Sequence, residues 1–359
     1  MPVGIGILIF LLAFGAGVVS KVAIKPSWAK DYSVEWSDEI GTLKSDLSYD
    51  DEEANKFDLY LPKDNSKETY GLVVYLHAGG FTTGDKSDDS QMLAWLCSKG
   101  YVAAGINYTL RTDAHLEVSV LSQSNEIKAA VPKVIEAAEA SGYHIDKMAM
   151  AGGSAGHCLA MIYAYRDGKD APVPVVFTYG AVGPSSFVVE DWGIFGLGQD
   201  TDESRTAGAG LFSVMSGESI TSEEIKDGSY REKVHAIAAA EWVENNPIPT
   251  VVAYGAHDRV QPFLASKRLE AALKENGVDY QYFVLEHSGH GLQNDSAIQK
   301  LWMEAIEEYL AKYMPVKRGG CYEESIEDYW NHFTCLFRFS RSVFVLADTQ
   351  RSVPEGDVS

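Results

Sequence analysis

The residues of this sequence that could do chemistry are a serine set among glycines and, further along the chain, an aspartate and a histidine. Ser154 stands in the stretch GGSAG, residues 152–156, which fits the pattern G-x-S-x-G. A serine hydroxyl is a weak nucleophile unless a base lies within hydrogen-bond reach. Asp258 in GAHDRVQP and His290 in HSGHGL follow in the order Ser, Asp, His. This order predicts a nucleophile, a group that orients the base, and the base itself.

Two neighbouring residues compete for the same roles. His287 is a rival base, but it follows the end of its predicted strand at once, whereas His290 lies between two glycines, so we favour His290. Glu286 is a weaker alternative to Asp258. His287 and His290 could also ligate a metal, but a lone H-x-x-H in a loop is weak support for such a site. We therefore expect no metal and no other cofactor.

A second glycine-rich loop, HAGGF at residues 77–81, supplies the fourth element. Acyl transfer develops negative charge on a carbonyl oxygen, which backbone N–H groups can stabilise if they point at it. Glycines let such a loop approach the reacting carbon closely. We expect the N–H groups of Gly79, Gly80 and Ala155 to form this oxyanion hole, and His77 to hold the loop through hydrogen bonds.

Each of these loops directly follows a predicted strand. Continuous apolar strands alternate with amphipathic helices, which favours a mostly parallel sheet covered on both faces. In such a sheet ligands bind at the carboxyl ends of the strands. The sequence therefore predicts a single doubly wound α/β domain. Its strands are expected at 56–62, 71–77, 101–110, 147–152, 173–183, 248–258 and 279–289.

Several segments flank or interrupt this domain, which we place at residues 56–314. Residues 21–55 form an acidic and irregular leader. Residues 184–247 are an insertion before the strand that carries Asp258, and they could act as a cap. Residues 315–359 form an appendage to which the sequence assigns no role.

Aromatic side chains are expected to line a substrate pocket beside Ser154. Phe81 comes from the glycine-rich loop, and Phe187 and Trp192 come from the insertion. Each of them could equally be an ordinary core residue, because aromatic side chains are common in packed interiors.

The first residues form an apolar run that carries no charged side chain before Lys21. Small residues near its end suit signal-peptidase cleavage after Ser20, although the run lacks the usual positive charge in front of it. We expect residues 1–20 to be a signal peptide or an uncleaved membrane anchor, and the protein to be secreted or held at the membrane.

The four cysteines fall into two pairs. Cys97 and Cys158 lie in apolar helical runs and are expected to be buried. Cys321 and Cys335 lie in the appendage and could form a disulfide in an exported protein.

The formal net charge of −21 limits the partners of the protein. Nucleic acid and anionic membrane surfaces would be repelled, so neither is expected as a partner. A membrane is expected only if the N-terminal run is an anchor. A small neutral substrate fits best.

The motifs HAGGF, NYTL, GGSAGHCLA, GAHDRVQP and HSGHG resemble those of single-domain esterases of the α/β-hydrolase superfamily. The acetylxylan/feruloyl esterase-like hydrolases and the HGGG carboxylesterases of the hormone-sensitive-lipase type are the most similar groups. The resemblance covers residues 56–314 and implies hydrolysis of carboxylic esters through an acyl-enzyme, with Ser154, Asp258 and His290 in the matching positions. The motifs are specific for the superfamily but not for a substrate. Our leading hypothesis is a serine esterase that acts on short-chain or aromatic acyl esters, with O-acetyl groups on carbohydrate as one candidate.

Two residues depart from the family pattern. Ala78 replaces the first glycine of HGGG, which leaves the later two glycines as donors. His157 stands where many relatives carry a glycine, and it could either narrow the pocket or form a local hydrogen bond. Two other functions stay open: an amidase or peptidase with the same triad, and a non-catalytic binding protein displayed at the membrane.

Overall fold

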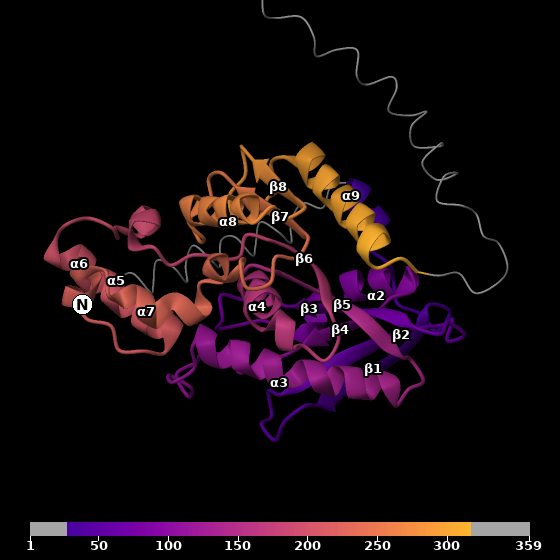
Figure 1. Ribbon diagram of the computed structural model, residues 1–359. Coiled ribbons are helices and arrows are strands. Elements are labelled where there is room, and N and C mark those ends of the chain that lie inside the picture. Colours follow the sequence, from indigo (N-terminus) through magenta and orange to yellow (C-terminus); the bar gives the residue numbers. More distant parts are fainter. Residues whose placement is uncertain (1–26, 317–359) are drawn as a thin grey trace, which may run out of the picture. The chain divides into compact units, whose positions relative to one another are not determined.

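Apolar runs of the sequence form the strands of one sheet in the computed structural model, which describes residues 27–316 (Figure 1). The strands are β1 (Gly41–Ser48), β2 (Lys56–Pro62), β3 (Tyr70–Leu76), β4 (Val102–Ile106), β5 (Ile145–Gly153), β6 (Val175–Ala181), β7 (Thr250–Gly255) and β8 (Tyr280–Leu285). They lie side by side in the order β1-β2-β4-β3-β5-β6-β7-β8. Neighbours from β4 to β8 are parallel, and β1 and β2 are antiparallel to their neighbours.

Helices cover both faces of this sheet, as the sequence predicted. The α-helices are α2 (Ser90–Ser98), α3 (Val120–Glu139), α4 (Ala155–Ile162), α5 (Asp202–Ser216), α6 (Ser222–Asp227), α7 (Tyr230–Val234), α8 (Phe263–Glu275) and α9 (Ser296–Tyr313). Side chains of α3, α4 and α8 share one hydrophobic core, and those of α2 and α9 share a second core on the opposite face. The inner strands, such as β3 and β4, are buried on both sides, which explains their continuous apolar runs. The doubly wound α/β fold is therefore confirmed.

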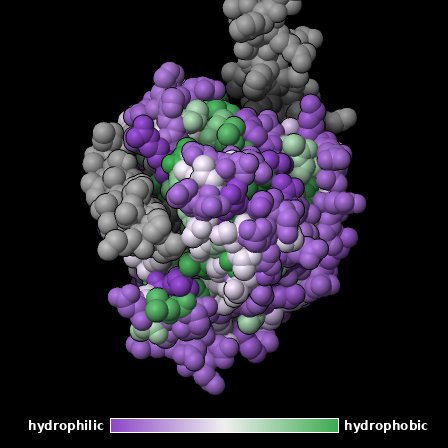
Figure 2. Space-filling view, turned by 90° about the vertical axis from the view of Figure 1, so that its left-hand side faces the viewer, coloured by the Kyte–Doolittle hydropathy of each residue, from purple (hydrophilic) through white to green (hydrophobic). Residues whose placement is uncertain are grey.

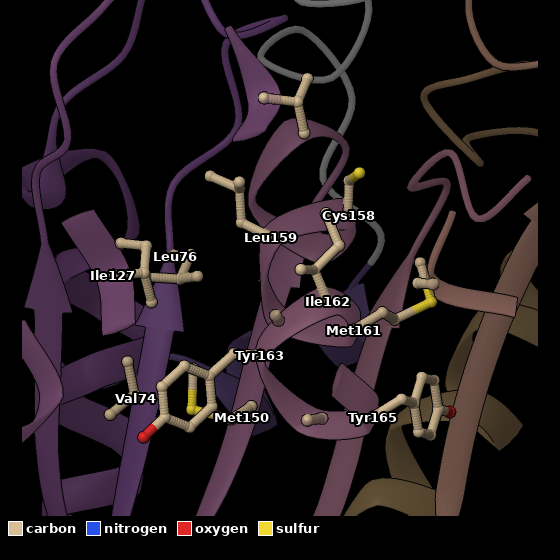
Figure 3. Packing of buried hydrophobic residues seen from close by; sticks show 14 of the residues in the cluster. Val74, Leu76, Ile127, Met150, Cys158, Leu159, Met161, Ile162, Tyr163 and Tyr165 are labelled. Carbon is tan, nitrogen blue, oxygen red and sulfur yellow. The ribbon is translucent and has the colours of Figure 1, made fainter. Parts of the chain in front are cut away.

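Helix α4 lies at the centre of the first core. Figure 3 shows Leu159 and Ile162 of α4 beside Leu76 of β3 and Ile127 of α3. All four side chains are fully buried. This packing fixes the position of α4, and with it the position of Ser154 at its N-terminus.

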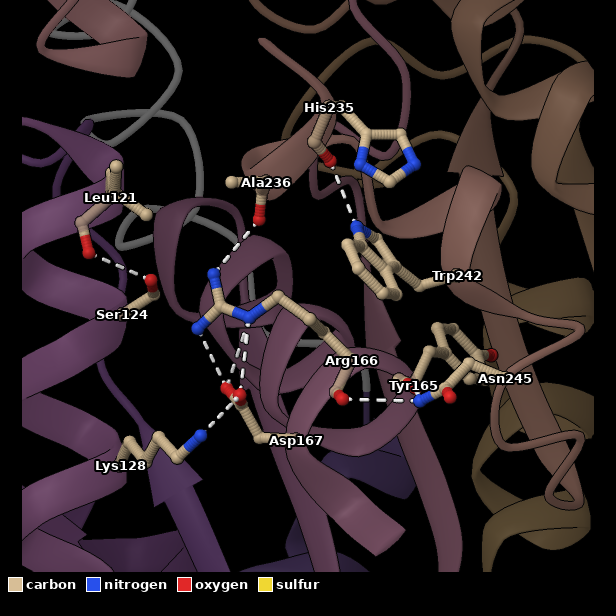
Figure 4. A network of polar contacts seen from close by, with 10 residues as sticks. All are labelled: Leu121, Ser124, Lys128, Tyr165, Arg166, Asp167, His235, Ala236, Trp242 and Asn245. Atoms are coloured by element: carbon tan, nitrogen blue, oxygen red, sulfur yellow. Dashed lines mark hydrogen bonds and ion pairs between the residues drawn. The ribbon is translucent and has the colours of Figure 1, made fainter. Parts of the chain in front are cut away.

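The insertion predicted at residues 184–247 lies between β6 and β7. It contains α5, α6 and α7 and begins with the 3₁₀ segment η5 (Val189–Phe195). Polar contacts tie its later part to the body of the protein (Figure 4). The Arg166 guanidinium, just beyond α4, donates to the Ala236 carbonyl over 2.8 Å, and Asp167 accepts from Lys128 of α3 over 3.1 Å.

The surface on the side of α5 and α6 is mostly hydrophilic, with small separate apolar areas (Figure 2). This agrees with the strongly acidic composition. Between residues 27 and 316, no helix combines the length and apolarity needed to cross a bilayer.

Within the segment 21–55, for which an irregular leader was predicted, residues 41–48 form a regular strand. Strand β1 pairs with β2 from Gly41 opposite Pro62 to Ser48 opposite Lys56. Before it, Tyr32 packs against Trp95 of α2 with ring centroids 5.5 Å apart. Because β1 is a half-exposed edge strand with polar residues on both faces and a register shift, it lacks the apolar run that revealed the other strands. The α/β domain therefore begins before residue 56.

Several predictions fall on other parts of the chain. Residues 1–20 lie outside the described range, and so does nearly all of the appendage, including Cys321 and Cys335. Cys97 and Cys158 are buried and carry free thiols, as expected.

Candidate active site

Ser154, Asp258 and His290 meet at the carboxyl edge of the sheet. Ser154 follows β5, Asp258 follows β7, and His290 follows β8, so the carboxyl ends of three strands contribute one residue each, with β6 between β5 and β7. The His290 Nε2 atom lies 2.8 Å from the Ser154 Oγ, and its Nδ1 atom lies 2.7 Å from the Asp258 Oδ2. Serine, histidine and aspartate thus form one continuous hydrogen-bonded chain.

The turn around Ser154 has a strained backbone. Ser154 has a φ of 53° and a ψ of −118°, outside the conformations that most residues adopt. A side chain at Gly152 would lie 2.5 Å from the Gly156 carbonyl carbon, and one at Gly156 would lie 1.9 Å from the Leu76 carbonyl oxygen. The two glycines are therefore required because the strand, the turn and α4 approach one another closely. The turn directs the serine hydroxyl toward His290.

Backbone hydrogen bonds fix the orientation of the Asp258 carboxylate. It is buried, and its Oδ1 atom accepts the N–H groups of Val260 over 2.8 Å and Gln261 over 3.0 Å. The Oδ2 atom remains for His290, so Nδ1 of the imidazole donates and Nε2 is free to accept the serine proton. The pairing therefore selects the tautomer that a general base needs.

The rival base His287 lies apart from this chain. Its side chain is 80% exposed, and its Nδ1 atom bonds to Asp295 over 2.8 Å. Asp295 also accepts from the Ser288 hydroxyl over 2.7 Å, so the pair helps to shape the loop that carries His290. The two histidines therefore contact two different carboxylates. In the described part of the chain, no three His, Cys, Asp or Glu side chains are grouped as metal ligands.

The glycine-rich loop after β3 is held by many hydrogen bonds. The Gly79 carbonyl accepts the N–H groups of Thr82 and Thr83 over 3.1 and 3.0 Å. Phe81 has a φ of 67°, and the fully buried Gln123 side chain donates to its carbonyl over 3.0 Å. Gln123 could not be predicted from the sequence, because a glutamine inside a helical pattern carries no signal that it supports a distant loop.

His77 supports the same loop from below. Its Nδ1–H donates to the Ala78 carbonyl over 2.7 Å, and its ring stacks on Tyr108 with centroids 4.3 Å apart. The Tyr108 hydroxyl donates to the His77 carbonyl over 2.9 Å. Burial lowers the pKa of His77, so the ring is neutral at pH 7. The imidazole is not part of the hydrogen-bonded chain at Ser154.

Two of the three expected oxyanion donors lie at the same cavity as Ser154. Gly80 and Ala155 line a small cavity together with Ser154 and His290. Ala155 is the first residue of α4, where backbone N–H groups have no partner inside the helix and carry partial positive charge. Gly79 does not line the cavity. Its role as a donor stays a prediction.

Two of the three residues that were expected to line the pocket do so. Phe81 and Trp192 line the cavity, whereas Phe187 does not. The Phe187 ring is buried behind Trp192, stacked on it with centroids 5.5 Å apart. Phe187 packs into the core and is not among the side chains that line this cavity. The cavity is also lined by Pro184, Met215, Val260 and Gln261.

His157, the departure in the nucleophile turn, forms a local hydrogen bond and does not line the cavity. Its side chain is completely buried, and its Nδ1 atom accepts the Gly183 N–H over 3.1 Å. The Tyr254 hydroxyl donates to the Gly183 carbonyl over 3.0 Å. His157 therefore fixes the chain that leads to Pro184, one of the cavity walls.

Because burial lowers the pKa of His157 to about 3, its ring should make stability depend on pH. Between about pH 6.5, the ordinary histidine pKa, and pH 3, the unfolded chain binds one more proton at this site than the folded chain. Acidification through this window therefore lowers the free energy of unfolding. His157→Asn keeps an acceptor for Gly183 and cannot titrate. We expect the wild type to lose on the order of 3 kcal/mol more than this variant between pH 7 and pH 4.

Urea unfolding of both proteins at several pH values measures this difference. The comparison uses the change in the free energy of unfolding with pH, so any pH-independent loss of stability caused by the substitution cancels. Equal pH dependence of the two proteins would contradict a neutral buried ring at this position.

Comparison with known proteins identifies a family and a shared fold. The BD-FAE family model matches residues 57–273, more than half of the chain. A truncated carbohydrate esterase from gut microbiota is similar in structure, with a TM-score of 0.57 and 16% identity, over 76% of this chain and 98% of that one. Esterase B from Lactobacillus Rhamnosis has a TM-score of 0.57 and 19% identity, over 83% and 95% of the two chains. These likenesses show a shared fold.

A curated relative matches a shorter stretch. Kynurenine formamidase from Danio rerio is 28% identical over 118 residues, which cover 33% of this chain and 37% of that protein. The match thus spans little more than a third of the relative's length.

Proposed function

This chain belongs to the BD-FAE family and has the α/β-hydrolase fold, and from this we propose that it is a serine hydrolase that cleaves carboxylic esters through an acyl-enzyme. The observation that carries the proposal is the chain Ser154–His290–Asp258, with contacts of 2.8 and 2.7 Å, at a cavity lined by Gly80 and Ala155. Acyl transfer needs a nucleophile that is hydrogen-bonded to a base, a carboxylate that orients this base, and backbone donors for the oxyanion.

In the proposed reaction Ser154 Oγ attacks the ester carbonyl while His290 takes its proton. Asp258 stabilises the imidazolium that forms, and the N–H groups of Gly80 and Ala155 stabilise the negative charge on the carbonyl oxygen. His290 then gives its proton to the leaving alcohol, and the acyl group stays on the serine. A water molecule, deprotonated by His290, releases the acid and restores the serine.

The proposed substrate is a small neutral ester. The net charge of −21 disfavours anions, and the cavity walls of Phe81, Trp192 and Met215 are apolar. The likeness to a carbohydrate esterase supports O-acylated carbohydrate as one source of such esters.

A second candidate is amide hydrolysis by the same residues, which the match to kynurenine formamidase favours. Amides need stronger protonation of the leaving nitrogen, and His290 could supply that proton. The two candidates therefore differ in the leaving group and not in the acyl transfer.

Hydrolysis of a matched pair, p-nitrophenyl acetate and 4-nitroacetanilide, separates the two candidates. We expect the ester to have the higher kcat/KM. A higher kcat/KM for the anilide would favour the amidase, and hydrolysis of neither substrate would contradict the serine hydrolase.

We also propose that the protein is exported and that residues 1–20 are a cleaved signal peptide or a membrane anchor. The apolar run that reaches Val19 supports this. N-terminal sequencing of the mature protein tests it: a start near Lys21 indicates cleavage, an intact N-terminus in the membrane fraction indicates an anchor, and an intact N-terminus in the cytosol contradicts export.

A further inference from the structure

Gln261 brings a polar side chain to the cavity beside Ser154. The triad fixes its backbone, because Asp258 Oδ1 accepts the Gln261 N–H over 3.0 Å. The residue is only 2% exposed, and its side-chain Oε1 atom has no hydrogen-bond partner among residues 27–316. Buried polar atoms are nearly always paired, because an unpaired one loses its hydration without compensation. This unpaired acceptor beside the reacting serine therefore indicates a ligand that carries a donor.

The orientation of the Gln261 amide follows from its one weak contact with Gly183. The amide nitrogen lies 3.5 Å from the Gly183 carbonyl oxygen, which is long for a hydrogen bond. Because a carbonyl can only accept, the nitrogen and not the oxygen of the amide must lie on this side. The same carbonyl already accepts the Tyr254 hydroxyl over 3.0 Å. The Gln261 amide therefore gains little inside the protein, and its oxygen is left for another partner.

A second buried glutamine, Gln123, has contacts that explain its burial. Its Oε1 atom is also unpaired, but its amide nitrogen donates to the Phe81 carbonyl over 3.0 Å and to the Thr109 carbonyl over 2.8 Å. Both contacts have ordinary hydrogen-bond lengths, and Gln123 does not line the cavity. The loop that it holds thus accounts for Gln123, whereas no contact inside the protein accounts for Gln261.

The strand order separates Gln261 from the oxyanion donor Gly80. Strands β3 and β7, which precede Gly80 and Gln261, lie on opposite sides of β5, which precedes Ser154. A carbonyl whose oxygen lies against Gly80 directs its two other substituents away from Gly80, toward the side of Gln261. Both the acyl group and the leaving group can therefore carry the donor that meets this side chain.

We propose that Gln261 Oε1 accepts a hydrogen bond from the substrate, so that the preferred substrates are esters with a hydroxyl or N–H group close to the scissile carbonyl. This proposal rests on the proposed function, because it concerns the substrate that Ser154 attacks. The terminal torsion of a glutamine side chain is soft, which lets Oε1 turn toward a bound donor. Gln261 is then a specificity-determining residue, which binds the donor and takes no part in proton transfer.

Two pairs of esters that differ in the donor test this proposal. The acyl pair is ethyl 2-hydroxypropionate and ethyl 2-methoxypropionate, and the leaving-group pair is 2-hydroxyethyl propionate and 2-methoxyethyl propionate. Each methoxy ester keeps the oxygen and loses the donor. We measure kcat/KM of the full-length protein by titration of the released acid, and divide each hydroxy-to-methoxy ratio by the same ratio for alkaline hydrolysis. We expect a normalised ratio on the order of 10 in at least one pair.

The variant Gln261→Met keeps the length of the side chain and removes the acceptor. It should lower the normalised ratio of that pair by on the order of 10-fold. The bulk of the methoxy group is the same for both proteins, so it does not account for a change in the ratio. Gln123→Met is the matched control, because it removes a buried glutamine that does not line the cavity. It should lower kcat/KM of both esters alike, through the loop that it holds, and leave the ratio unchanged.

The outcomes separate this proposal from the proposed function. If the esters are hydrolysed and neither pair has a raised ratio, the donor contact is wrong and the ester hydrolase stands; these wild-type ratios decide even where a variant fails to fold. If Gln261→Met lowers kcat/KM of both members of a pair alike, the side chain only supports the cavity wall and the proposal fails. If no ester is hydrolysed, both proposals fail. A raised ratio that the variant abolishes supports the contact, and the pair in which it occurs assigns the donor to the acyl group or to the alcohol.

Discussion

We expect Ser154→Ala to lower kcat for p-nitrophenyl acetate by on the order of 10⁴-fold to 10⁶-fold, as removal of the nucleophile does in other serine hydrolases. The substitution deletes only the hydroxyl that lies 2.8 Å from His290 Nε2. It keeps the β-carbon, so the backbone strain at a φ of 53° is the same in the variant and in the wild type. The fold should survive while the acyl-enzyme cannot form.

Steady-state hydrolysis and thermal unfolding of the two proteins together test this expectation. An unchanged melting temperature assigns the loss of rate to chemistry. A variant that keeps its fold and retains more than about a tenth of the wild-type kcat would contradict a nucleophilic role for Ser154, since a nucleophile contributes far more than that.

The second large effect is expected at the base. His290→Gln should lower kcat by on the order of 10³-fold to 10⁶-fold, because glutamine cannot take the serine proton. His287→Gln provides the matched control three residues earlier in the same loop. Its ring is 80% exposed and pairs with Asp295, and an exposed pair is worth at most about 1 kcal/mol, so kcat should stay within about fivefold of the wild type.

Added imidazole sharpens this comparison. We expect it to restore part of the activity of His290→Ala, because free imidazole can enter the space of the missing ring and accept the proton. An inactive His287 variant beside an active His290 variant would reverse the assignment. Equal losses in both variants would point to collapse of the loop as the cause.

The fold and the three central residues could be predicted because each residue lies in a loop that follows an apolar strand. Ser154 and Asp258 follow the buried strands β5 and β7, and His290 follows the half-buried edge strand β8. Such strands have continuous apolar sequences, and their carboxyl ends must share one edge of a parallel sheet. Ser154, Asp258 and His290 were therefore brought together by topology alone. The distances of 2.8 and 2.7 Å needed the structure.

Other features could not be read from local patterns. Strand β1 was not predicted because it lies at the edge of the sheet and pairs with β2 through backbone hydrogen bonds. Such pairing does not require a continuous apolar sequence. Phe187 and Trp192 lie five residues apart in an irregular segment with no periodicity, so only tertiary packing decides that Trp192 faces the cavity and Phe187 stands behind it.

The contact made by His157 needed the structure for a similar reason. Its partner, Gly183, lies in the loop after β6 and is distant in sequence. A histidine in the nucleophile turn therefore had two open interpretations until the loop was placed. Because the His157 ring is neutral and accepts the Gly183 N–H, it can be buried in the first turn of α4.

The measurement that tests the central claim most directly is the stoichiometry of labelling by paraoxon, an organophosphate that transfers its phosphoryl group to an activated serine. Intact-mass analysis of the wild type should show the gain of one diethylphosphoryl group, with peptide mapping placing it on Ser154 and p-nitrophenyl acetate hydrolysis lost in parallel. The Ser154→Ala variant should gain nothing under the same conditions. An unlabelled wild type, or a label on any other residue that accompanies the loss of activity, would contradict the assignment of Ser154 as the activated nucleophile.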